Sequence, residues 1–235
     1  MAITIEAFTF DWYGTLANHR HKGRGALFSE YLASRGLKAA PWDRSVLYEV
    51  FDYYGRRYKP QSSDEEKQSF WIEFTSLLFE RARVRGIGSN PAGIHAAEIA
   101  AIFGAGCFQL YPDVQPVLQR LRREGLRLAV ISNWHRGLES FCIEMNLSDL
   151  IETVIVSADV GIEKPDSRIY AEAAHRLGVE PNRIIHVGDL LHEDFDGAMS
   201  AGFRAVLIDR LNKHPAHPCR ITSLFELQRQ VSLLE

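Results

Sequence analysis

The sequence predicts an α/β protein in which a doubly wound parallel sheet carries an inserted all-helical domain. Short apolar strands alternate with helices from residue 111 onward, which is the pattern of a parallel sheet covered on both faces. A first strand lies apart from this series, near the N-terminus. Residues 17–110, between the two, show helical periodicity without a strand pattern. We therefore predict a core domain of residues 1–16 and 111–235 and a helical domain of residues 17–110.

The first strand of the core is predicted over residues 3–11, ITIEAFTFD. Its apolar side chains, ending with Phe8 and Phe10, are those of a buried strand. The Gly14-Thr15 pair that follows favours a turn. Asp11 is therefore expected where a buried strand stops and a loop begins.

The inserted domain is predicted to contain four helices. They span residues 26–37, 45–58, 64–83 and 91–103. In the third, bulky side chains recur at i, i+4, i+7 and i+8 from Phe70 onward, the spacing of one helix face. Acidic residues occupy its first turn and arginines its last, which complements the helix dipole.

The remaining core elements alternate regularly. The predicted strands are 126–133, 153–158, 183–189 and 204–209, and the predicted helices are 114–125, 137–147, 166–178, 194–202 and 223–235. Right-handed crossovers between such strands produce a doubly wound sheet. The stretch 211–220, LNKHPAHPCR, is predicted to be a surface loop before the last helix.

Composition excludes several classes of partner. A formal net charge of −3 gives no reason to expect nucleic acid or an anionic membrane as a partner. The three cysteines have no metal-type spacing, which favours a reduced, cytoplasmic setting over a disulfide framework. We read no signal peptide and no apolar run long enough to span a membrane. A small anionic substrate is the expected partner, and both monomer and homodimer remain open.

Polar side chains follow the predicted strands at the points where the strands end. They are Asp11, Ser132-Asn133, Asp159 and Gly188-Asp189, with Lys164 in a loop before a helix. Because ligands bind at the carboxyl ends of strands in such sheets, these side chains are expected to share one site. That site would combine three or more carboxylates with an ammonium and small hydroxyl donors.

This set of groups suits nucleophilic displacement. A carboxylate that attacks phosphorus or carbon divides one difficult displacement into two easier steps. Clustered carboxylates repel one another unless a cation binds, and Mg²⁺ prefers oxygen ligands. The Lys164 ammonium and the hydroxyls of Thr15 and Ser132 would stabilise charge on the transferring group.

These residues resemble the four motifs of the haloacid dehalogenase (HAD) superfamily. The first motif corresponds to residues 10–16 (FDWYGTL) and the second to residues 131–133 (ISN). The lysine of the third motif corresponds to Lys164 within KPDSRIY, and the fourth to residues 188–194 (GDLLHED). The helical insertion after the first motif is similar to the cap of this superfamily, and the core is Rossmann-like.

The resemblance implies a role for each motif residue. Asp11 would be the nucleophile, and Lys164 would steady it and the substrate anion. The groups implied to hold the oxygens of the transferring group are Thr15, Ser132 and Asn133. The groups implied to bind Mg²⁺ are Asp189, Asp194, Asp11 and the backbone carbonyl of Tyr13.

Tyr13 departs from the phosphatase pattern of the superfamily. Phosphatases usually have a second Asp there as the general acid, and a phenol with a pKa near 10 is a poor replacement. The L-2-haloacid dehalogenases have D-x-Y-G-T-L and S-N in their first two motifs and need no metal. The spacing from Lys164 to Tyr170 also matches that branch.

The fourth motif indicates instead the Mg²⁺-dependent phosphatases of the superfamily. Dehalogenases typically have Ser at the position of Asp189 and Asn at that of Leu191. A second carboxylate beside Asp11 would repel it without a cation, so Asp189 favours a metal site. Tyr13, Arg56 and Tyr170 are the predicted substrate-binding residues.

The predicted function is Mg²⁺-dependent hydrolysis of a small phosphorylated substrate through a covalent intermediate on Asp11. One alternative is a metal-independent L-2-haloacid dehalogenase. Another, of a different class, is a catalytically weak relative that binds a ligand or partner. The replacement for the missing general acid stays open among His19, His21, His192 and Glu193.

Overall fold

The computed structural model describes residues 4–41, 44–87 and 91–231. The chain forms two compact units. Unit 1 contains Met1–Asn18, Leu110–Trp134 and Asn146–Glu235. Unit 2 contains His19–Gln109 and His135–Met145. The chain passes between the units through β2 (Ala17–His19) and β3 (Phe108–Leu110), which pair as a two-stranded sheet.

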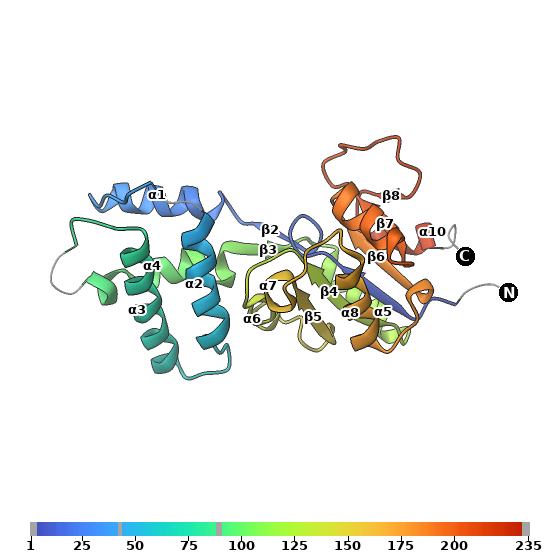
Figure 1. The fold of residues 1–235 in the computed structure, drawn as a ribbon, viewed down its shortest axis with the longest axis horizontal. Coiled ribbons are helices and arrows are strands. Elements are labelled where there is room, and N and C mark those ends of the chain that lie inside the picture. The colour runs from blue at the N-terminus through green and yellow to red at the C-terminus, as the bar shows by residue number, and fades with distance from the viewer. Residues whose placement is uncertain (1–3, 42–43, 88–90, 232–235) are drawn as a thin grey trace. The chain divides into compact units, whose positions relative to one another are not determined.

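Unit 1 is built on a six-stranded parallel sheet of order β5-β4-β1-β6-β7-β8 (Figure 1). The strands are β1 (Ala7–Phe10), β4 (Arg127–Ser132), β5 (Thr153–Val156), β6 (Ile184–Gly188), β7 (Arg204–Ile208) and β8 (Arg220–Ile221). Phe10 pairs with Val130 on one side and with Val187 on the other. The predicted fold class, a doubly wound parallel sheet, is confirmed, and β1 lies in its interior.

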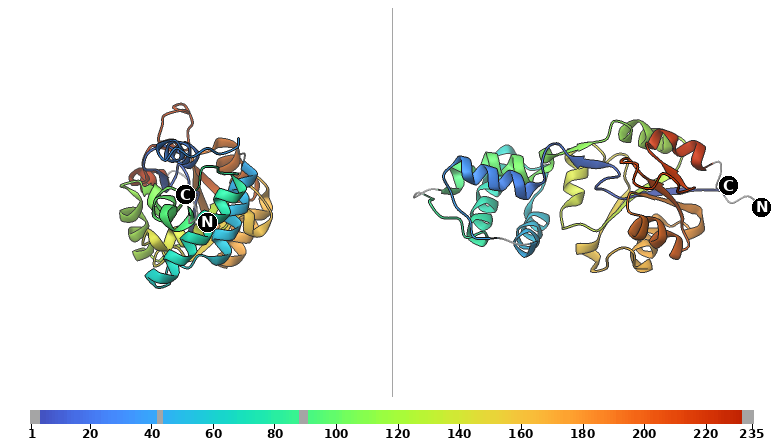
Figure 2. Two further views of the ribbon diagram at one scale, coloured as in Figure 1. Left: turned by 90° about the vertical axis from the view of Figure 1, so that its left-hand side faces the viewer. Right: turned by 90° about the horizontal axis from the view of Figure 1, so that it is seen from above.

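Helices cover both faces of this sheet, as the right-hand view of Figure 2 shows. The helices α8 (Ser167–Leu177) and α9 (Gly197–Ser200) lie on one face, and α5 (Val114–Arg123) and α10 (Leu227–Val231) lie on the other. Ile169, Ala173 and Leu177 recur every four residues on α8 and are fully buried against the sheet. This apolar stripe, rather than intrinsic propensity, is what holds α8 in place.

Unit 2 is helical and has an aromatic core. Its main helices are α1 (Arg24–Ser34), α2 (Arg44–Arg57), α3 (Asp64–Arg81) and α4 (Pro91–Phe103). Phe51, Tyr54, Phe74 and Phe103 are buried and contact one another. Helix α3 begins at a capping box in which Ser63 and Glu66 satisfy each other's backbone amides.

One predicted core helix belongs to unit 2. The sequence placed residues 137–147 in the α/β core, but the helix α6 (Leu138–Glu144) lies in unit 2. The reason is the packing of aromatic side chains within this helix and just before it. The His135 ring stacks on Phe51 with the ring centroids 3.6 Å apart, and the Phe141 ring lies 5.3 Å from Tyr54.

Several element boundaries also differ from the prediction. The helix predicted at 194–202 begins as a π-helical turn, η3 (Leu191–Asp196), before α9. Asp159, predicted to follow a strand directly, lies on a short helix, α7 (Ser157–Val160). Strand β8 begins at Arg220, within the predicted surface loop. The parts of the first strand and last helix predicted at residue 3 and at 232–235 lie outside the described residues.

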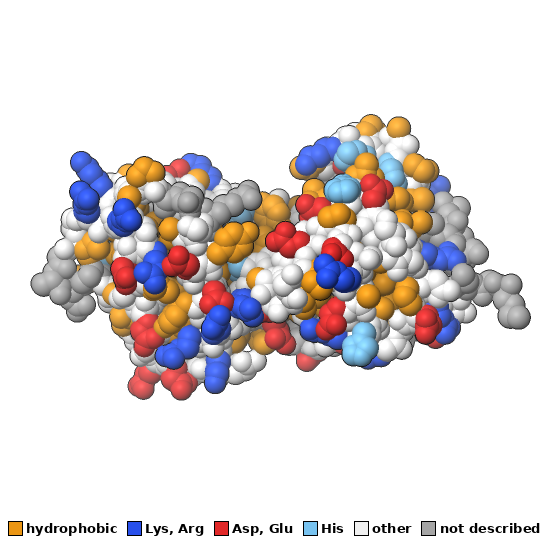
Figure 3. Space-filling model, in the orientation of Figure 1, with side chains coloured by type: hydrophobic (Ala, Val, Ile, Leu, Met, Phe, Trp, Pro, Cys, Tyr) orange, Lys and Arg blue, Asp and Glu red, His pale blue; other side chains and the backbone are white. Residues whose placement is uncertain are grey.

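The surface has mixed charge. Figure 3 shows acidic and basic side chains interspersed on the face in view of each unit, which agrees with the small net charge. The cysteines Cys107, Cys142 and Cys219 are free thiols. Among the residues that the structure describes, there is no helix with the length and apolar character to cross a membrane.

The aromatic core of unit 2 leads to a prediction about stability. Phe51 is 1% exposed, whereas Tyr48 on the same helix is 56% exposed. We expect Phe51→Ala to lower the free energy of unfolding by about 3–5 kcal/mol, because it removes a large buried side chain. Tyr48→Ala, the matched control, should change it by less than about 0.5 kcal/mol. Urea unfolding followed by fluorescence tests this, and equal losses in both variants would contradict it.

Candidate active site

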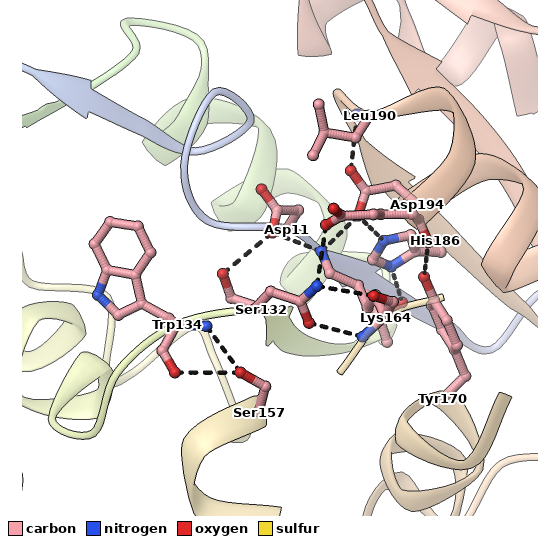
Figure 4. Close-up of polar contacts among 12 residues, drawn as sticks. Asp11, Ser132, Trp134, Ser157, Lys164, Tyr170, His186, Leu190 and Asp194 are labelled. Atoms are coloured by element: carbon pink, nitrogen blue, oxygen red, sulfur yellow. Dashed lines mark hydrogen bonds and ion pairs between the residues drawn. The ribbon is translucent and has the colours of Figure 1, made fainter. Parts of the chain in front are cut away.

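Four segments of unit 1 bring polar side chains together at the carboxyl end of the sheet (Figure 4). Asp11 follows β1, Ser132 ends β4, and Asp194 lies on η3 after β6. Lys164 comes from the loop that precedes α8. The strand ends meet here because β1 lies between β4 and β6 in the sheet, so the predicted convergence of these three motifs with Lys164 is present.

Lys164 lies at the centre of this group. Its Nζ donates to Asp11 Oδ1 at 2.7 Å and to Asp194 Oδ1 at 2.5 Å, and its side chain is 1% exposed. Burial alone would lower the pKa of this ammonium. The two carboxylates outweigh burial and raise its pKa, so Lys164 stays charged.

Lys164 and Ser132 both donate hydrogen bonds to the same oxygen of Asp11, Oδ1. Ser132 Oγ donates to Oδ1 at 3.2 Å, and this is the same oxygen that Lys164 contacts. Burial raises the pKa of Asp11 to about 6, with Lys164 opposing that rise. The carboxylate is therefore mostly ionised above neutral pH, and the second oxygen, Oδ2, takes neither of these two hydrogen bonds.

The pKa values of Asp194 and Asp189 are shifted in opposite directions. Asp194 is buried, but its ion pair with Lys164 and the hydrogen bond from His186 Nε2 at 3.3 Å lower its pKa. The backbone amide of Leu190 also donates to Asp194 Oδ2, at 2.9 Å. Burial, followed by the charges of Asp11 and Asp194, raises the pKa of Asp189 to about 7, although the charge of Lys164 opposes that rise.

The three carboxylates are arranged so that they fit a cation. Asp11, Asp189 and Asp194 each offer one oxygen, and these oxygens lie within 4.8 Å of one another. One ammonium balances only part of their charge. The loop of residues 11–16 between β1 and β2, here called the motif-one loop, also packs tightly on this group, since a Cβ on Gly14 would lie 2.4 Å from Asp189 Oδ2. Three hard oxygen donors with an excess of negative charge suit Mg²⁺.

Asn133, which is predicted to hold substrate oxygens, makes hydrogen bonds within the protein through its side-chain amide. Its Oδ1 accepts from the Lys164 amide at 2.7 Å, and its Nδ2 donates to the Lys164 carbonyl at 2.9 Å. The same Nδ2 donates to Glu193 Oε2 at 3.0 Å. The side-chain amide of Asn133 therefore holds the backbone of Lys164 in place. It also donates to Glu193, one of the residues predicted as a replacement for the missing general acid.

Thr15 and Tyr170 are also enclosed by the protein. Both are fully buried. Thr15 Oγ1 has no hydrogen-bond partner in the described part of the chain, and its contact with a substrate oxygen stays a prediction. Tyr170 donates from its hydroxyl to the Glu193 carbonyl of η3 at 2.5 Å, and its contact with substrate stays a prediction.

Tyr13 and Arg56, the other predicted substrate-binding residues, are both accessible. Tyr13 is 40% exposed, and its ring stacks on Trp134 with the centroids 6.0 Å apart. Burial raises the pKa of Tyr13, which weakens it further as an acid. Arg56 belongs to unit 2, where its Nε pairs with Asp52 Oδ2 at 3.0 Å.

Two residues of the site were missed from the sequence. His186 lies inside β6, and its Nδ1 is 2.8 Å from Thr9 Oγ1 while its Nε2 contacts Asp194. Ser157 holds the backbone of Trp134, with its Oγ 3.2 Å from the amide and 3.3 Å from the carbonyl. A polar residue within an otherwise apolar strand was the available signal for His186, whereas nothing in the sequence marks Ser157.

The comparison with known families agrees with this geometry. A family model of haloacid dehalogenase-like hydrolases matches residues 5–202. The chain therefore belongs to the haloacid dehalogenase-like hydrolases, and the family predicted from the sequence motifs is confirmed.

The relatives of this chain include phosphatases and dehalogenases. It is 32% identical to a glyceraldehyde 3-phosphate phosphatase of Methanopyrus kandleri, over 65% of this chain and 68% of the relative. It is 27% identical to haloacid dehalogenase-like hydrolase domain-containing protein 3 of Bos taurus, over 88% of this chain and 82% of the relative. A 2-haloacid dehalogenase structure from Pseudomonas syringae pv. Tomato DC3000 matches with a TM-score of 0.65 and 25% identity, covering 99% of this chain and 100% of that chain.

The raised pKa of Asp189 leads to a prediction about pH. Its pKa of about 7 lies above the unfolded value near 4, so the metal-free folded protein binds a proton that the unfolded chain releases over this range. Stability from this group is thus present at low pH and lost as the pH rises through 7. At pH 8 the free energy of unfolding of Asp189→Asn should therefore be higher than that of wild type by about 1–3 kcal/mol.

The gap between the two proteins should be smaller at pH 5, where Asp189 is protonated in the folded protein, and should close only below the unfolded pKa near 4. Urea unfolding in EDTA at both pH values measures this gap. A gap that is equal at pH 5 and pH 8 would contradict the predicted repulsion.

Proposed function

We propose that this hydrolase removes a phosphoryl group from a small phosphorylated substrate, with Asp11 as the nucleophile and Mg²⁺ as the cofactor. The observation that carries the proposal is the group of three carboxylates, Asp11, Asp189 and Asp194, around a single ammonium. A site with this excess of negative charge repels a substrate anion until a cation is bound.

The hydrogen bonds of Asp11 support its role as the nucleophile. Lys164 and Ser132 both donate to Oδ1 and hold the carboxylate in place, and one oxygen of this carboxylate attacks phosphorus. The bond from phosphorus to the leaving oxygen breaks, and that oxygen departs with its electron pair. Water then attacks the aspartyl phosphate, which releases inorganic phosphate and restores the carboxylate. Lys164 holds Asp11 in line and stays protonated throughout.

Asp11, Asp189 and Asp194 would hold Mg²⁺, with the Tyr13 carbonyl as a further ligand. When bound, the ion would neutralise charge on the transferring oxygens. The pKa of about 7 for Asp189 means that binding competes with a proton. Apparent Mg²⁺ affinity is therefore expected to weaken as the pH falls below 7.

Tyr13 limits which leaving groups are accepted. Its side chain is a weak acid whose pKa is raised further by burial. A substrate whose leaving group is already acidic needs little protonation. Aryl phosphates and other esters of acidic alcohols are therefore the preferred class under this proposal.

A second candidate is hydrolysis of a carbon–halogen bond in a 2-haloacid. Tyr13 favours it, because halide departs without a proton. The likeness to a 2-haloacid dehalogenase structure at 25% identity also supports it. Asp189 opposes it, because a carboxylate beside Asp11 without a cation raises the pKa of the nucleophile.

One assay separates these functions. Wild type should release phosphate from p-nitrophenyl phosphate with Mg²⁺, and EDTA should abolish the release. Asp11→Asn should lower kcat by roughly a thousandfold or more, because the nucleophile is lost. Chloride release from L-2-chloropropionate that is insensitive to EDTA would reverse the ranking. Activity on neither substrate would favour a ligand-binding role.

Restoring an acid at position 13 provides a second test. Tyr13→Asp should raise kcat for an alkyl phosphate by about tenfold or more, because a positioned acid protonates the poor leaving group. It should change kcat for p-nitrophenyl phosphate by less, since that leaving group needs no proton. Tyr13→Leu, which restores no acid, is the matched control. Equal gains with both variants would refute a role for the acid.

A further inference from the structure

A partly buried arginine, Arg210, joins the motif-one loop to three other segments of unit 1. Arg210 follows β7, and its guanidinium donates twice to the backbone carbonyl of Thr15, from Nε at 3.2 Å and from Nη2 at 2.9 Å. It also forms a two-point ion pair with Asp113, with both N···O distances at 2.9 Å. The exposed fractions of the Arg210 and Asp113 side chains are 10% and 4%.

The ion pair is itself held in a defined orientation. Asp113 Oδ2 accepts from Ser223 Oγ at 2.6 Å and from the Leu224 amide at 2.8 Å. The Arg210 guanidinium lies over the Tyr111 ring, 3.8 Å from its centroid. Two-point pairing and stacking use the planar fork of arginine, and the point charge of lysine reproduces neither.

The Thr15 carbonyl lies in the loop that carries the predicted nucleophile. This loop turns at Gly14, which has φ of +86°. Its other backbone contacts include those from Leu16 and Ala17 to the Trp12 carbonyl, both at 2.9 Å. Because Thr15 is fully buried, its carbonyl needs a partner within the protein, and Arg210 supplies two donors.

We infer that Arg210 is a positioning residue for the hydrolase reaction: through the Thr15 carbonyl it sets where the loop of Asp11 lies relative to Lys164. The ion pair with Asp113 keeps the guanidinium aimed at that carbonyl. The role applies to phosphate and haloacid substrates alike, because both reactions use Asp11. Arg210 contacts neither Asp11 nor Lys164 directly.

Arg210→Lys tests this role against a matched control. Arg220 also pairs with a buried aspartate, Asp209, at 3.5 Å, and it donates to Asn212 and Pro215 rather than to the motif-one loop. Arg210→Lys should lower kcat by about tenfold to a hundredfold with KM within about threefold, because the loop shifts by a fraction of an ångström. Arg220→Lys should leave kcat within about twofold.

Hydrogen exchange gives a readout that does not depend on activity. Amides of residues 12–17 should exchange faster in Arg210→Lys than in wild type, and no faster in Arg220→Lys. Unchanged exchange in this loop, or equal loss of kcat in both variants after correction for the folded fraction, overturns the inference. If Arg210→Lys does not fold, Asp113→Asn is measured in the same way, and a wild-type kcat and exchange pattern in that variant overturns it as well.

The kinetic assay uses whichever of p-nitrophenyl phosphate and L-2-chloropropionate the wild type hydrolyses. A wild type that hydrolyses neither counts against the proposed function, while the exchange measurement still decides the role of Arg210.

Discussion

The site depends on one buried ammonium between two carboxylates. Lys164 is almost completely excluded from water, and its hydrogen bonds to Asp11 and Asp194 join the end of β1 to the turn after β6. Removing one partner of such a pair leaves an uncompensated buried charge, which typically costs about 3–5 kcal/mol. The surrounding polar contacts, from Ser132, His186 and Asn133, all serve to orient the three members of this group.

The order of the strands explains why the charges meet at this place. Strand β1 comes first in the sequence, and later strands pair on both sides of it. Strands β4 and β6 therefore flank the end of β1. A crevice forms at the carboxyl ends where the order reverses, and ligands bind there in open α/β sheets. Asp11, the first residue after β1, lies at this reversal. Its position follows from topology as well as from local sequence.

The sequence indicated which residues gather at the site better than it indicated the hydrogen-bond partners of those residues. Asp11, Ser132 and Lys164 are where the motifs placed them. Asn133 and Tyr170 were predicted to meet the substrate, yet their polar atoms are used to hold Lys164 and η3. A motif records which residue type is needed, whereas the hydrogen-bond partners of that residue come from segments distant in the chain.

The sequence by itself determined the alternation of strands and helices, the helical insertion and the family, because hydrophobic period and motif spacing are local properties. Only the tertiary structure decided that residues 135–145 join unit 2, that His186 supports Asp194, and that Arg210 binds the Thr15 carbonyl. Each of these depends on packing between segments separated by many residues, where burial selects the partner. No periodicity along the chain encodes which buried donor meets which acceptor.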